Sequence, residues 1–184
     1  MTSIDIRLKP HEIALLKQLP GKKLEYIVHE RFLNTNLVYF VVKVKVETID
    51  PFYFYSCTEK LDYYGSTEDV AVMSIVSEPP FEYDQLDLIE TPINETIHSI
   101  DLVQENQQEF CGDEQEYDNY VTRGIIFNFD DSQLSIEKSI WFSESFVIGR
   151  GTNLIEAYAP VSDFGTDWAP GQSGKCIRTI ETLK

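Results

Sequence analysis

Apolar and polar residues alternate with a period of two along much of this chain, which is the pattern of half-buried β-strands. Three strands are predicted in the first 46 residues, the last two separated by a turn at Asn34-Thr35-Asn36. The residues expected to share one face are Ile4, Ile6 and Leu8; Leu24, Tyr26 and Val28; and Val38, Phe40, Val42, Val44 and Val46. The third set makes the clearest strand in the sequence.

One short helix interrupts this pattern near the N-terminus. Pro10 suits the first position of a helix, and Pro20-Gly21 is a typical stop signal. Between them, Ile13, Leu16 and Leu19 recur at helical spacing. We therefore predict a brief helix that begins at Pro10.

The remainder of the chain also favours strands. We expect strands at 52–55, 70–76, 121–129, 134–138 and 140–148, with turns at Asp130-Asp131-Ser132 and Gly149-Arg150-Gly151. The stretch 92–111 fits either a helix, with a stripe through Ile93, Ile97 and Ile100, or a strand rich in β-branched residues. The strand is slightly favoured.

These elements predict an α+β fold that is mainly β. We expect a strongly twisted antiparallel sheet, or a partly open barrel, with a short N-terminal helix. No composition shift marks a linker, so residues 1–184 are expected to form a single domain. Residues 159–184 have loop composition, with Phe164 and Trp168 as anchors.

The charge distribution is uneven. Residues 61–122 contain sixteen Asp or Glu and no Lys or Arg, while the rest of the chain has fifteen acids and fifteen bases. The formal net charge of −16 therefore arises entirely in this segment. A solvated surface would explain it, but so many like charges in one segment repel one another, and a basic partner would offset that cost.

This segment suggests a non-catalytic module that binds a basic protein in order to inhibit or regulate it. In composition it is similar to immunity-type nuclease inhibitors and nucleic-acid mimics, whose carboxylates stand in for phosphates. Direct binding to nucleic acid is disfavoured because phosphates would be repelled. The candidate partner-binding residues are Glu109, Asp113, Glu114, Glu116 and Asp118.

Two alternatives belong to other functional classes. The first is a β-barrel that binds a small ligand in an aromatic cavity lined by Phe52, Tyr53, Phe54, Tyr55, Tyr63, Tyr64, Phe81 and Tyr83. The second is an enzyme that uses carboxylates or a divalent ion, although no nucleophile, phosphate-loop or metal-ligand motif is present. No cofactor or metal is therefore expected.

The expected location is the cytoplasm. Residues 1–7 lack the pattern of a secretion signal, and the longest apolar-rich run, 37–46, is too short to span a membrane as a helix. Cys57, Cys111 and Cys176 are widely spaced and odd in number, as expected for reduced thiols. Arg123, the first base after the acidic segment, is expected to pair with one of the acids.

Overall fold

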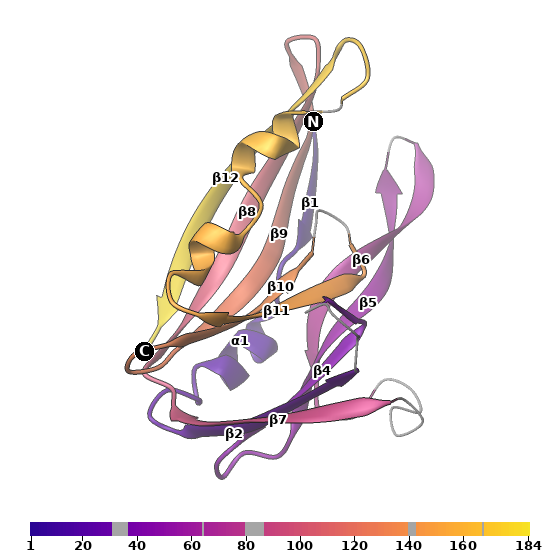
Figure 1. Cartoon of the computed structure of the whole chain (residues 1–184). Helices are drawn as coiled ribbons and strands as arrows, with labels where there is room; N and C mark the ends of the chain where they lie inside the picture. The colour runs from indigo at the N-terminus through magenta and orange to yellow at the C-terminus, as the bar shows by residue number, and fades with distance from the viewer. Residues whose placement is uncertain (31–36, 64, 80–86, 140–142, 167) are drawn as a thin grey trace.

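A computed structural model describes residues 1–30, 37–63, 65–79, 87–139, 143–166 and 168–184 and shows two β-sheets (Figure 1). The larger sheet has seven strands, with the path β12-β8-β9-β10-β11-β3 and β1 paired to β9. Its strands are β1 (Thr2–Ile6), β3 (Leu37–Tyr39), β8 (Ser99–Cys111), β9 (Glu114–Asn128), β10 (Gln133–Lys138), β11 (Ser145–Gly151) and β12 (Gln172–Leu183). All of its pairings are antiparallel except that of β1 with β9.

The smaller sheet has five antiparallel strands in the order β6-β5-β4-β2-β7. They are β2 (Lys23–Glu30), β4 (Val41–Val46), β5 (Phe52–Tyr63), β6 (Ser66–Val76) and β7 (Leu88–Thr96). Within the described residues no strand pairing joins the two sheets, so they do not close into a barrel. The fold is mainly β, with a short N-terminal helix, as the sequence predicted.

The helices are short. The helix α1 (Pro10–Leu16) begins at Pro10, as predicted. Two 3-10 helices, η2 (Leu154–Ala157) and η3 (Val161–Gly165), follow β11. None of the helices in the described part of the chain is long and apolar enough to cross a membrane.

The main hydrophobic core lies between the two sheets and α1. Its members come from nearly every element, and all are almost completely buried. They include Leu16, Leu24, Val42, Val44, Phe52, Phe54, Ile100, Ile125, Phe127, Ile136 and Phe146. The Phe54 ring of the smaller sheet packs edge to face against the Phe127 ring of the larger sheet, with 6.3 Å between the ring centroids. Such packing holds the two sheets together by apolar burial.

Two charged side chains from outside the smaller sheet hydrogen-bond the backbone of β6, which is an edge strand of that sheet. Glu12 of α1 accepts hydrogen bonds from the Ile75 backbone N–H at 2.6 Å and the Ser74 hydroxyl at 2.5 Å. From β10 of the larger sheet, the Lys138 ammonium donates to the Ala71 carbonyl. These contacts satisfy edge groups that would otherwise be open to another strand.

The structure corrects the predicted alternation in two strands. A register shift between Leu24 and Tyr26 places Leu24 in the main core but Tyr26 with Val28 in a separate cluster, so the three do not share a face. Phe40 has a φ of 62° and is 38% exposed, which separates β3 from β4. The predicted continuous strand therefore bends at Phe40 and passes from one sheet to the other.

Three further predictions are settled by the strand assignments. The stretch 92–111 is strand rather than helix, because β7 and β8 occupy it apart from a break at residues 97–98. Gly149-Arg150-Gly151 lies in β11 and pairs with β10, so the predicted hairpin turn is wrong. Residues 172–183 were predicted as loop but form β12. The predicted turn at 34–36 lies outside the described residues, and so do residues 140–142 of the strand predicted at 140–148.

Replacement of Glu12 by alanine is expected to lower the free energy of unfolding by about 2–4 kcal/mol, because it leaves the Ile75 N–H and the Ser74 hydroxyl without their acceptor. Urea unfolding measures this change. The matched control is Glu78→Ala, which removes an exposed carboxylate. Equal losses from both variants would show that Glu12 does not join α1 to β6.

Candidate functional site

The five predicted partner-binding acids lie in the β8–β9 hairpin but in different environments. Asp113 and Glu114 are exposed at the turn, and Glu116 and Asp118 are half-buried along β9. Glu109 is only 1% exposed. The structure therefore places four of the five at the surface and the fifth inside the molecule.

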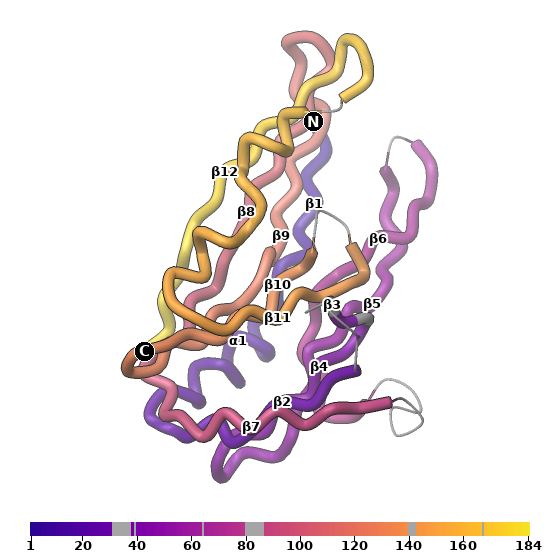
Figure 2. Tube along the Cα trace, in the orientation of Figure 1, coloured from indigo at the N-terminus to yellow at the C-terminus, as the bar shows by residue number. Residues whose placement is uncertain are grey.

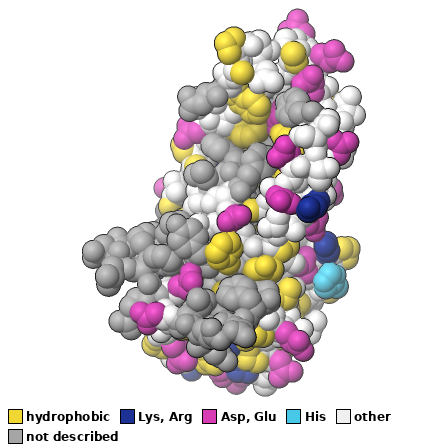
Figure 3. All heavy atoms as spheres, turned by 90° about the vertical axis from the view of Figure 1, so that its right-hand side faces the viewer, with side chains coloured by type: hydrophobic (Ala, Val, Ile, Leu, Met, Phe, Trp, Pro, Cys, Tyr) yellow, Lys and Arg dark blue, Asp and Glu magenta, His cyan; other side chains and the backbone are white. Residues whose placement is uncertain are grey.

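A second hairpin brings more acids to the same end of the molecule. The β5–β6 turn at Gly65 and the start of β9 line one notch of about 360 Å³, together with Met1 and Thr2. We call the surface acids of the two hairpins the acidic end: Asp62, Glu68, Asp69, Asp113, Glu114, Glu116 and Asp118. Both hairpins point to the top of Figure 1, and the same end is rich in Asp and Glu in Figure 3. One base, Lys60, lies opposite Asp69 in the β5–β6 ladder.

The other described acids of residues 61–122 do not join this end. Asp87, Glu90 and Glu95 lie on or beside β7 at the edge of the smaller sheet. Glu95 accepts a hydrogen bond from Ser132 and pairs with Arg150. Glu78 is exposed after β6, and Asp101 is half-buried near the start of β8. The described acids of the segment are therefore spread over the acidic end, the β7 edge, the interior and these two further positions. Glu82 and Asp84 lie outside the described residues.

Beneath the acidic end lies a buried polar row that the sequence did not predict. Glu105, Gln107 and Glu109 alternate along β8 and point to one face, and Asn119 of β9 lies directly opposite Gln107. All four are at most 2% exposed. The alternating pattern is also typical of a solvated face, so it gave no sign of burial.

The hydrogen bonds of this row fix the orientation of both side-chain amides. Gln107 Nε2 donates to Glu105 Oε2 at 3.0 Å, and Asn119 Nδ2 donates to Glu109 Oε1 at 2.8 Å. Carboxylates only accept hydrogen bonds, so each amide must turn its nitrogen toward its carboxylate. Gln107 Oε1 and Asn119 Oδ1 are then left buried with no donor among the described residues.

Glu105 connects the row to a buried charge cluster. Arg178 of β12 donates to Glu105 Oε1 through Nε at 3.0 Å and Nη2 at 2.6 Å, and also to the Ala159 carbonyl at 2.7 Å. Arg123, 2% exposed, has its Nε 3.9 Å from the same Glu105 oxygen. The predicted pairing of Arg123 with an acid of the segment is thus confirmed.

Glu137 of β10 completes the charge cluster. Burial raises the pKa of its carboxyl to about 7, although Arg123 and Arg178 favour the ionised form. The Oε2 atom of Glu137 is buried and has no hydrogen-bond partner among the residues that the structure describes. Desolvation thus outweighs the two nearby guanidinium groups.

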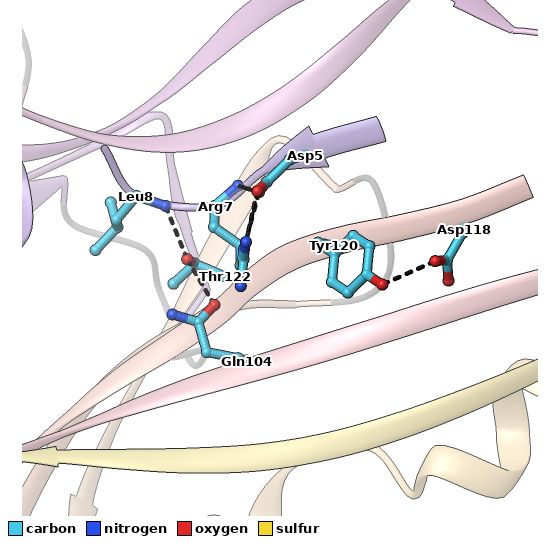
Figure 4. Close-up of polar contacts among 7 residues, drawn as sticks. All are labelled: Asp5, Arg7, Leu8, Gln104, Asp118, Tyr120 and Thr122. Atoms are coloured by element: carbon cyan, nitrogen blue, oxygen red, sulfur yellow. Dashed lines mark hydrogen bonds and ion pairs between the residues drawn. The ribbon is translucent and has the colours of Figure 1, made fainter. Parts of the chain in front are cut away.

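Asp118 is held in place on the opposite face of β9 (Figure 4). Its carboxylate accepts hydrogen bonds from Asn106 Nδ2 at 2.6 Å and from the Tyr120 hydroxyl at 2.8 Å. Partial burial disfavours the charge, but these hydrogen bonds outweigh it and lower the pKa of Asp118. Arg7 covers the Tyr120 ring at 5.1 Å and pairs with Asp5. Asp118 is therefore a fixed negative charge at the surface.

The aromatic residues proposed for a ligand cavity do not converge in the described structure. Phe52 and Phe54 pack in the main core, whereas Tyr53 joins a separate cluster. Tyr55 is half-buried, and Tyr63 lies at the tip of the β5–β6 hairpin. Tyr64, Phe81 and Tyr83 lie outside the described residues.

The described residues offer few other candidates for a catalytic or ligand-binding site. A cavity of about 450 Å³ beside the β1–α1 connection contains two bases, but Arg7 is paired with Asp5 and Lys9 with Glu59. Among the described residues, no three His, Cys, Asp or Glu side chains gather as a metal site would require. The three cysteines are free thiols.

Comparisons with protein-family models, with curated proteins and with solved structures find no match for this chain.

Replacement of Glu137 by glutamine is expected to stabilise the protein above pH 7. The raised pKa means that the native state holds a proton between pH 4.5 and about 7 that the unfolded state has released, so the Glu137 contribution to stability falls as pH rises through this range. The substitution removes this loss, a gain of up to about 3 kcal/mol at pH 7.5 and much less at pH 5. Urea unfolding of the wild type and the variant at these two pH values measures the change in the free energy of unfolding. An equal change at both pH values would contradict the raised pKa of Glu137.

Proposed function

We propose that this chain is a non-catalytic interaction module that binds a basic protein through the acidic end and thereby inhibits or regulates it. The observation that carries this proposal is the meeting of two hairpins from different sheets. The β5–β6 hairpin and the β8–β9 hairpin are far apart in the sequence, yet both line one surface notch. Seven acidic residues are thereby gathered at one end of the molecule.

Gathering like charges has a cost that a basic partner removes. Carboxylates on neighbouring hairpins repel one another, and a cationic surface placed against them converts this repulsion into attraction. The same field accelerates the approach of a basic protein, and salt screens it within about 8–10 Å. The proposal therefore requires binding that is selective for cations and weakened by salt.

Neutralising three acids at the end is expected to weaken binding of a labelled arginine decapeptide by tenfold or more at about 0.1 M salt. The variant is Asp113→Asn with Glu114→Gln and Glu116→Gln, and fluorescence anisotropy measures the affinity. Wild-type binding is expected to fall steeply by about 0.5 M salt, because exposed charge pairs are then largely screened.

The matched control removes the same number of charges elsewhere. It combines Glu78→Gln, Asp87→Asn and Glu90→Gln, which are exposed residues before and along β7. This control is expected to keep affinity within about threefold, because it leaves the acidic end intact while its net charge equals that of the first variant. If the two triple variants lose equal affinity, only net charge matters and the acidic end is not a binding surface.

A further inference from the structure

The inner polar row lies on the same hairpin as the acidic end and has acceptors without donors. Gln107 and Asn119 face each other across β8 and β9, and neither amide oxygen has a hydrogen-bond donor within the described part of the chain. Leaving such a group buried costs about 1–3 kcal/mol. The row is therefore suited to a group that carries several N–H donors.

Glu109 adds a carboxylate next to these two oxygens. It lies two residues from Gln107 on the same face of β8, and it accepts hydrogen bonds from Asn119 Nδ2 and from the Tyr63 hydroxyl. Two amide oxygens and one carboxylate thus share one small region. A positively charged donor fits this set better than a neutral one, because hydrogen bonds to charged groups are the stronger ones.

Aromatic rings flank the row. The centroids of the Tyr63 and Tyr117 rings are 4.6 Å apart, and Tyr117 of β9 pairs with Glu109 of β8. On the other side, Gly174 of β12 is the cross-strand neighbour of Glu109, and a Cβ at Gly174 would clash with the Trp168 indole. The indole of Trp168 therefore occupies the space above Gly174. Carboxylates between aromatic rings are typical surroundings for a guanidinium group.

The strand pair that carries Tyr63 extends beyond the other strands of the smaller sheet. β4 pairs with β5 only as far as Tyr55, and Ser56 N–H donates to the Phe40 carbonyl, so residues 57–63 of β5 have only β6 as a paired strand. This two-stranded ribbon projects beyond the five-stranded sheet (Figure 2). The ribbon packs on the larger sheet through Val70 and Val72, and at its tip Tyr63 contacts Glu109 and Tyr117.

We propose that the row receives the guanidinium group of an arginine side chain from the basic partner. The guanidinium replaces the Tyr63 hydroxyl on Glu109 and donates its other N–H groups to Gln107 Oε1 and Asn119 Oδ1. A guanidinium presents five N–H donors in a rigid plane, whereas a lysine ammonium presents three around one point. This inference rests on the proposed function, because it assigns the residue of the partner that the acidic end attracts.

The probe is N-acetyl-arginine amide, titrated by NMR against the full chain at millimolar concentration. We expect saturable shifts for Gln107 and Asn119 side-chain amides, with at least fivefold weaker binding of the lysine analogue and of the neutral, isosteric citrulline analogue. Tyr63→Phe removes the hydroxyl that competes for Glu109, so it should bind the arginine probe at least threefold more tightly. Gln107→Met removes one acceptor and should weaken binding at least threefold.

Two results would overturn this inference. One is equal binding of the arginine and lysine probes; the other is unchanged binding in both the Tyr63→Phe and Gln107→Met variants, each confirmed as folded by its NMR spectrum. The triple variant of Asp113, Glu114 and Glu116 should bind the single-arginine probe within twofold of wild type while losing the decapeptide. Loss of the decapeptide without specific arginine binding refutes only the inner site. Failure of the decapeptide to bind wild type refutes the proposed function itself.

Discussion

The open edge of β6 is the constraint on which the arrangement of the two sheets depends. An edge strand exposes backbone groups that must find partners, and here Glu12 and Lys138 provide them at Ile75 and Ala71. Glu12 belongs to α1, and Lys138 belongs to β10 of the larger sheet. These hydrogen bonds therefore connect both the helix and the larger sheet to the edge of the smaller sheet. Burial lowers the pKa of Lys138 to about 8, so the contact between Lys138 and Ala71 carries a desolvation cost.

The same edge determines where the acidic end can form. The backbone groups of Ile75 and Ala71 are held by these hydrogen bonds. In the same part of β6, the β5–β6 ribbon packs against the larger sheet through a small apolar cluster of Ile6, Val70, Val72 and Val121. The tip of the ribbon then reaches Glu109 through Tyr63. The position of one hairpin relative to the other is thus set by a few contacts between sheets rather than by strand pairing.

Sequence pattern predicted the elements better than their connections. Most strands and the start of α1 were predicted correctly, because alternation and Pro10 are local signals. The bend at Phe40 and the register shift after Leu24 depend on backbone geometry that alternation does not encode. In the site, Asp113 and Glu114 were chosen for their charge, and the structure places them at a β8–β9 turn that the pattern did not predict. Burial of Glu109 did not follow, because the residue that caps it, Tyr63, is 46 positions away in the sequence.

The two levels of polarity at this end have different physical consequences. Exposed carboxylates interact over several ångströms of water, so they can attract any cation and are weakened by salt. Buried acceptors act only at hydrogen-bond distance, and each one left without a donor costs free energy, so they discriminate by shape and donor count. A surface of the first kind alone would bind basic proteins with little selectivity. In the proposed function, the buried row beneath it is the part that distinguishes one cationic side chain from another.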